Sequence, residues 1–130
     1  MTGLDTNILV RLFIKDDPEQ GFRGAAFMRN LTPESPGYVS LVALIELVWV
    51  LGSKYRLSKA ELIPCVERLL DSPDLVVEDH AAVTLALHRF SQHHADFADC
   101  LIERLGHAAG CRETVTFDVK AANLTGMRLL

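Results

Sequence analysis

The chain has 130 residues, of which 49% are hydrophobic and 23% are charged, a composition that supports one globular domain with a sizeable core. Its three cysteines form no CxxC pair, so neither a disulfide framework nor a zinc knuckle is indicated, and a reducing cytoplasm fits best. The formal charge of −4 argues against a generally basic nucleic-acid coat, and no membrane-spanning run or signal peptide is visible. We therefore expect a single cytoplasmic domain over residues 1–130 that does not enter a membrane.

Short β-type segments alternate with longer helical segments along the chain. The expected strands lie near residues 2–5, 37–40, 74–78 and 113–117, with a further one at 127–129. The expected helices are NILVRLFI, residues 18 to about 30, LVALIELVWVLGSKY, KAELIPCVERLL, AAVTLALHRF, DFADCLIERLGHAAG and the short VKAANL. This alternation predicts an α/β fold with a mainly parallel central sheet of four to five strands.

Local chemistry supports several of the helix boundaries. Asp17 followed by Pro18 is typical of an N-cap and a first-turn proline, and Ser58 is a second candidate cap. Pro64 lies within the helix that Ser58 begins and should bend or interrupt it, because proline has no N–H to donate. Gly110 follows HAA and predicts the end of a helix.

Acidic residues recur where the predicted strands end. Asp5 ends the first strand and Asp118 ends the fourth, while Glu46 lies in the second turn of the helix that follows GYVS. Asp96 and Asp99 begin the helix before the fourth strand, and the start of that helix lies at the same edge if the helix packs antiparallel to the strands. Parallel sheets bind ligands beyond the carboxyl ends of their strands, so this edge is the candidate site.

Glu46 is the most unusual of these acids because SLVALIELVWVLG contains no other charge. Val42, Ile45 and Trp49 flank Glu46 at helical spacing and leave it no obvious polar face, so we expect a buried carboxylate that needs a partner. That partner could be an arginine such as Arg11, or a cation in a pocket at the end of the sheet.

Four carboxylates in one pocket would repel each other unless a cation offset their charge. Oxygen ligands without His or Cys suit Mg²⁺, or Mn²⁺, better than zinc. A metal held in this way lowers the pKa of a coordinated water and neutralises charge on a phosphodiester, which makes phosphoryl chemistry the natural use of such a site.

Four segments, in order, resemble the PIN domain and most closely its VapC group of toxin ribonucleases. They are GLDTN, VSLVALIELVWVL, DFADCLIERLGHAAGC and TVTFDVKAANL, and the resemblance covers essentially the whole chain. It implies a three-layer α/β/α fold and a Mg²⁺- or Mn²⁺-dependent endoribonuclease that hydrolyses RNA with metal-activated water. It also implies inhibition by a VapB-like antitoxin and assembly into a homodimer.

The resemblance assigns the metal-binding and catalytic positions to particular residues of this chain. Asp5 is the acid of LDTN, Glu46 is the helix glutamate, Asp99 is the second acid of DFAD and Asp118 is the acid of TFD. The full acidic set is therefore present.

Further positions match supporting residues of the family. Thr6 and Thr116 match hydroxyls that hydrogen-bond to the acids or to metal-bound water, and Asn7 completes the DTN motif. Asp96 is either the N-cap of its helix, with Asp99 three residues later as in a capping box, or an outer contact to the metal.

Other interpretations remain open at the level of sequence. Asp5, Asp99 and Asp118 could be ordinary cap or first-turn residues. His93 and His94 could serve a metal-independent ribonuclease, although a solvated loop explains them as well. The protein could also be a catalytically weak module that binds RNA or an antitoxin. A phosphoaspartyl domain is disfavoured, because a phosphatase of that kind has a second Asp where this chain has Asn7. Five basic residues could hold phosphate around the pocket, with no firm role for any of them: Arg11, Lys15, Lys54, Arg56 and Lys59.

Overall fold

The computed structural model describes residues 1–130, and the chain divides into two units, Met1–Glu78 and Asp79–Leu130. Both contain helices and parallel strands, so the predicted α/β class is confirmed. The single domain over residues 1–130 stays a prediction. None of the helices has the length and apolar character that spanning a membrane would require.

The first unit is built on a three-stranded parallel sheet in the order β1-β2-β3. Gly37 of β2 lies opposite Thr2 of β1 on one side and Leu75 of β3 on the other. Pairs of helices connect the successive strands, as parallel pairing requires. The elements are β1 (Thr2–Gly3), α1 (Thr6–Phe13), α2 (Pro18–Arg29), β2 (Gly37–Val39), α3 (Leu41–Ser53), α4 (Lys59–Asp71) and β3 (Leu75–Val77).

The core of the first unit is made by the apolar faces of its helices and by the central strand. The fully buried side chains include Val39 of β2, Val66 of α4 and five leucines, Leu9, Leu44, Leu47, Leu51 and Leu69. Gly37 lies where the core leaves no room for a side chain. A Cβ at this position would lie 2.8 Å from Cδ1 of Leu4 and 3.0 Å from both Cδ1 of Leu31 and Cδ2 of Leu75.

The predicted helix starts in this unit are confirmed. Asp17 caps α2 by accepting a hydrogen bond from the backbone N–H of Gln20 at 3.0 Å, and Ser58 forms a capping box with Glu61. The sequence predicts that Pro64 bends or interrupts the helix that Ser58 begins; the interruption does not occur, since α4 runs from Lys59 to Asp71, and the bend stays a prediction. We attribute this continuity to the buried face of α4, which packing stabilises despite the missing proline N–H.

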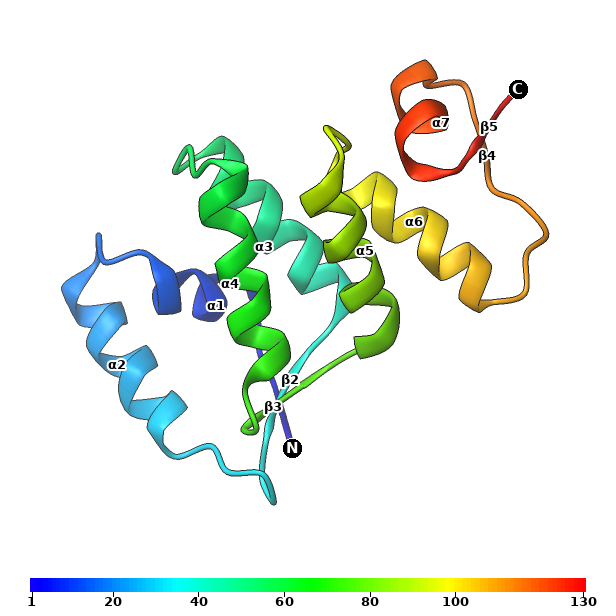
Figure 1. The fold of residues 1–130 in the computed structure, drawn as a ribbon. Helices are drawn as coiled ribbons and strands as arrows, with labels where there is room; N and C mark the ends of the chain where they lie inside the picture. Colours follow the sequence, from blue (N-terminus) through cyan, green and yellow to red (C-terminus); the bar gives the residue numbers. More distant parts are fainter. The chain divides into compact units, whose positions relative to one another are not determined.

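The second unit contains three helices and a pair of parallel strands. Helices α5 and α6 lie side by side (Figure 1), and the rings of Phe90 and Phe97 meet edge to face with centroids 5.7 Å apart. Gly110 ends α6 as predicted, with a φ of +90° and with its N–H donating to the carbonyl of His107. The elements are α5 (His80–Gln92), α6 (Phe97–Ala108), β4 (Val115–Thr116), α7 (Val119–Thr125) and β5 (Arg128–Leu129).

All five strands therefore appear where the sequence predicts them, with two or three residues each. They form a three-stranded sheet and a separate β4-β5 pair rather than one sheet of four to five strands. The segment between β3 and β4 consists of α5, α6 and their loops, and β4 takes its partner from the chain end just beyond α7.

Candidate active site

Asp5 lies two residues after the end of β1, at the carboxyl edge of the first unit's sheet, and is exposed. It is the N-cap of α1, and its Oδ1 accepts a hydrogen bond from the backbone N–H of Thr6 at 2.9 Å. Thr6 itself is buried, whereas Asn7 is exposed and lines a cavity of about 480 Å³ between α1 and α2. Asp5 thus has its ordinary cap role and still presents its carboxylate to solvent.

Glu46 lies on α3 and is exposed, so the expectation that its carboxylate is buried is wrong. Val42 and Trp49, which were expected to bury it, are themselves 76% and 69% exposed. The face of α3 that packs into the core carries Leu44, Leu47 and Leu51. Both faces of this helix are apolar, so hydrophobicity alone does not determine which of them is buried. The alternative of an Arg11–Glu46 salt bridge is also wrong, since Arg11 pairs with Asp16.

Glu78 is an acid at this edge that the sequence reasoning missed. It directly follows β3, and its Oε2 accepts a hydrogen bond from the N–H of Leu41, the first residue of α3, at 2.8 Å. The pKa of Tyr38 is raised, first by burial and then by the charge of Glu78. The rule that identified Asp5, an acid at the end of a parallel strand, applies equally to DLVVE and would have found Glu78.

Asp96 and Asp99 lie at the start of α6 in the second unit. Asp96 is the N-cap, with its Oδ1 accepting from the backbone N–H of Asp99 at 3.2 Å. Asp99 is half-buried, and burial raises the pKa of its carboxyl, with the negative charges of Asp96 and Asp118 adding to the effect. The acids of this unit therefore interact electrostatically, and no cation is among the groups that shift the pKa of Asp99.

Asp118 follows β4 and is the N-cap of α7, where its Oδ1 accepts from the backbone N–H of Ala121 at 3.1 Å. Its own N–H donates to Oγ1 of Thr116 at 3.0 Å. The Thr116 hydroxyl thus fixes the backbone that leads into Asp118 and orients the cap. Asp118 is exposed, like Asp5.

The four predicted metal ligands divide evenly between the two units. Asp5 and Glu46 belong to the first, and Asp99 and Asp118 belong to the second. Within neither unit do three or more His, Cys, Asp or Glu side chains gather in a way that could hold a metal ion. The donors present nevertheless fit a hard divalent cation in kind, since all are carboxylates, and Asp99 bears burial and repulsion that a cation would relieve.

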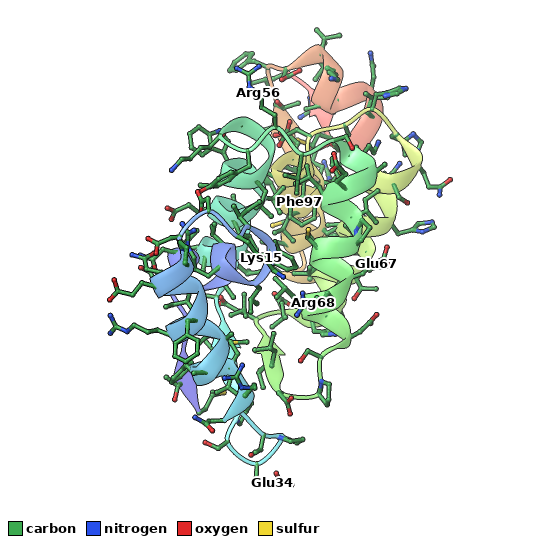
Figure 2. All side chains as sticks on the ribbon, turned by 90° about the vertical axis from the view of Figure 1, so that its left-hand side faces the viewer. Lys15, Glu34, Arg56, Glu67, Arg68 and Phe97 are labelled. Atoms are coloured by element: carbon green, nitrogen blue, oxygen red, sulfur yellow. The ribbon has the colours of Figure 1, made fainter.

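A cavity of about 720 Å³ in the first unit lies elsewhere. It is lined by residues of α1, α2 and α4, by the loops after α1 and α4 and by Leu75 of β3; Lys15 and Arg68 are among these residues and lie near each other in Figure 2. None of the four acids lines this cavity, the smaller one near Asn7 or the one between α5 and α6. His93 and His94 are exposed in the loop between α5 and α6, as the solvated interpretation predicts.

In parallel α/β sheets, ligands bind beyond the carboxyl ends of the strands, and Asp5, Glu78 and Asp118 follow the ends of three strands here. The family model of the PIN domain matches residues 4–126, a span that runs through both units. The chain belongs to the PIN domain family. Among curated proteins no match to it is found.

Membership confirms the resemblance to the PIN domain, while the likeness to the VapC group stays a prediction. The PIN domain is a three-layer α/β/α fold, and PIN domains are generally nucleases that hydrolyse phosphodiester bonds and use divalent metals. All four candidate acids and the four supporting residues fall within the matched span.

Proposed function

We propose that this protein is a Mg²⁺- or Mn²⁺-dependent endoribonuclease whose metal is held by Asp5, Glu46, Asp99 and Asp118. The observation that supports the proposal is the match to the PIN family model, whose span of residues 4–126 includes all four acids. A bound divalent cation would lower the pKa of a water and offset the charge of the scissile phosphate. Thr6, Asn7, Asp96 and Thr116 are proposed as supporting residues.

The caps of the two helices favour this use of the acids. In both Asp5 and Asp118, Oδ1 accepts a hydrogen bond from a backbone N–H. This bond orients the carboxylate, and Oδ2 makes no hydrogen bond within the chain. A carboxylate oriented in this way can offer its second oxygen to a cation without giving up the cap. The helix start and the metal ligand are then served by the same side chain.

The biological setting is part of the same proposal. The closeness of the sequence motifs to the VapC group supports a toxin of a VapBC-type pair, with RNA as substrate and a VapB-like antitoxin as inhibitor. A homodimer is proposed on the same ground. The stretch 47–60 contains Lys54, Arg56 and Lys59 and no acid, which gives an acidic chain a local surface suited to RNA phosphate.

A cleavage assay on structured RNA with Mg²⁺ tests the proposal through Asp5→Asn and Glu46→Gln. Asparagine caps helices as well as aspartate does, so Asp5→Asn removes the charge and keeps the helix start. We expect each variant to lose at least about 100-fold in rate, because even the outer partners of metal ligands contribute about 10- to 100-fold. Glu67→Gln, at an exposed position on α4 (Figure 2), is the matched control and should cleave normally. Undiminished cleavage by both site variants would remove the carboxylates from the mechanism.

A second candidate function is a PIN-like module that binds RNA or an antitoxin without efficient cleavage. It is favoured by the lack, within either unit, of three or more His, Cys, Asp or Glu side chains grouped so that they could hold a metal ion. Calorimetry distinguishes the two. An absence of Mn²⁺ binding together with tight RNA association would support the module and contradict the nuclease.

A further inference from the structure

One face of α3 is unpartnered and carries an unusual combination of side chains. Val42, Glu46 and Trp49 recur at helical spacing, all three are exposed, and we call them the α3 stripe. Trp49 is the only tryptophan of the chain, and a side chain of that size at 69% exposure leaves most of its indole in water. An exposed indole next to a candidate catalytic acid is suited to a ligand with a flat apolar group that can stack on the ring.

We propose that Trp49 stacks against a base of single-stranded RNA and so positions the strand at Glu46, an inference that rests on the proposed RNA substrate. Trp49 lies three residues after Glu46, which is about 4.5 Å along a helix axis at ~1.5 Å per residue. Side chains in a helix lean toward its N-terminus, so the indole covers the surface on the Glu46 side of its own Cα. A base on that ring lies next to the carboxylate.

The charges that follow α3 suit the backbone of the same strand. Between Glu46 and Glu61 the chain has three basic side chains, Lys54, Arg56 and Lys59, and no acidic one, in a protein whose formal charge is −4. Lys54 is the C-cap of α3, and Arg56 is exposed in the loop beyond it, at the end of the first unit opposite Glu34 in Figure 2. Base stacking beside a cationic track is how proteins hold single strands.

The loop that carries these cations is held in place rather than left free. The Tyr55 hydroxyl donates to Oδ2 of Asp16 at 3.0 Å, and Asp16 also pairs with Arg11. The N–H of Leu57 donates to the carbonyl of Leu51 at 2.9 Å, which ties the loop back to α3. Lys54 and Arg56 are therefore presented from a fixed backbone, so that little ordering is needed when a strand binds.

A second copy of the chain suits the α3 stripe less well than RNA does. Covering Val42 and Trp49 against another protein would also bury the Glu46 carboxylate between them, which is unfavourable unless the partner supplies a matching cation. RNA can stack on Trp49 and keep Glu46 in contact with water.

Titration of the full chain in EDTA with a single-stranded oligouridine of about ten nucleotides, a length within the usual range of such sites, tests the inference. We expect saturable quenching of the Trp49 fluorescence, and none from an abasic oligonucleotide of equal charge. In fluorescence anisotropy with labelled RNA, Trp49→Ala should weaken affinity by about 5- to 100-fold, the usual range for one stacked base, while Trp49→Phe should retain most of it. Phe22→Ala, at an aromatic on α2 that is 72% exposed, is the matched control and should bind as the parent does. With Mg²⁺ present, the loss in Trp49→Ala should be in KM and not in kcat.

The inference would be overturned if the Trp49 emission did not change on addition of RNA and the parent and Trp49→Ala bound RNA with equal affinity. Emission that changes with protein concentration alone, together with a dimer that Trp49→Ala dissociates in sedimentation, would also overturn it by assigning the α3 stripe to a second copy. Failure of the proposed nuclease is a separate result, because quenching by RNA without any cleavage would support the stacking site and reject the enzyme.

Discussion

Among the four proposed metal ligands, Asp99 is the one whose charged form lowers the stability of the metal-free fold. It is half-buried, and burial followed by the charges of Asp96 and Asp118 raises its pKa above the ordinary value of an aspartate. The folded state therefore binds this proton more tightly than the unfolded state does. The free energy of unfolding falls as pH rises through the titration of Asp99.

Asp99→Asn should consequently raise the free energy of unfolding of the metal-free protein at pH 7. The gain should shrink as pH is lowered toward the ordinary aspartate pKa of about 3.9, where the parent side chain becomes neutral as well. Urea unfolding in EDTA at several pH values measures the difference, with Glu67→Gln as a control for the loss of a surface charge. A variant that is less stable than the parent at neutral pH would contradict this description of Asp99.

Glu46 shows what residue-level sequence reasoning could and could not reach. Its place in the family motif was readable, but its burial was not. Every neighbour within four residues on α3 is apolar, so composition gives no sign of which side packs. The structure selects Leu44, Leu47 and Leu51 for the core and leaves Val42 and Trp49 in water. Glu78 differs from Glu46 because local sequence suffices to find it: it ends the strand segment DLVVE as Asp5 ends the first.

At the scale of elements the sequence was far more informative, because helix starts and stops are set by local chemistry. Asp17, Ser58, Asp96 and Gly110 all act at the boundaries their residue types predict. Pro64 did not break α4, because a buried face elsewhere on the helix outweighs one lost hydrogen bond. The strands were located correctly, but which strands pair depends on contacts distant in the chain, and the β4-β5 pair could not be foreseen.

The central strand provides a test at this scale. Gly37→Ala would place a methyl group among the tips of Leu4, Leu31 and Leu75, and overpacking of this kind costs about 1–3 kcal/mol. Gly3→Ala is the matched control. Gly3 lies in β1 and pairs with Tyr38 of β2, and a Cβ on it would have no atom within 4 Å. Urea unfolding should show the loss for Gly37→Ala and a change of less than about 0.5 kcal/mol for Gly3→Ala, as for an ordinary surface substitution. Equal stability of the two variants would mean that the core yields around β2 more easily than the structure indicates.

At the scale of the whole molecule, the proposed function requires acids of both units to bind the same metal ion. The family model spans residues 4–126 and therefore both units, and each unit contributes two of the four acids. The four acids can be selected from the sequence through the family motifs. The rules for strand ends and helix caps, in contrast, concern only the residues near each boundary. A metal ion that binds the folded chain would also raise the free energy of unfolding, because the unfolded chain does not bind it.

The measurement that tests this claim most directly is Mn²⁺ calorimetry on the parent chain, Asp5→Asn, Asp99→Asn and the double variant. Each single variant keeps its backbone contacts and removes one carboxylate charge, in the first unit for Asp5 and in the second for Asp99. We predict that either change alone weakens the same Mn²⁺-binding event by at least about tenfold, the low end of the loss when outer partners of metal ligands are changed. The double variant should lose no additional binding event. Two independent binding events, one removed by each variant, or Mn²⁺ binding that neither variant alters, would contradict a site shared by the four acids.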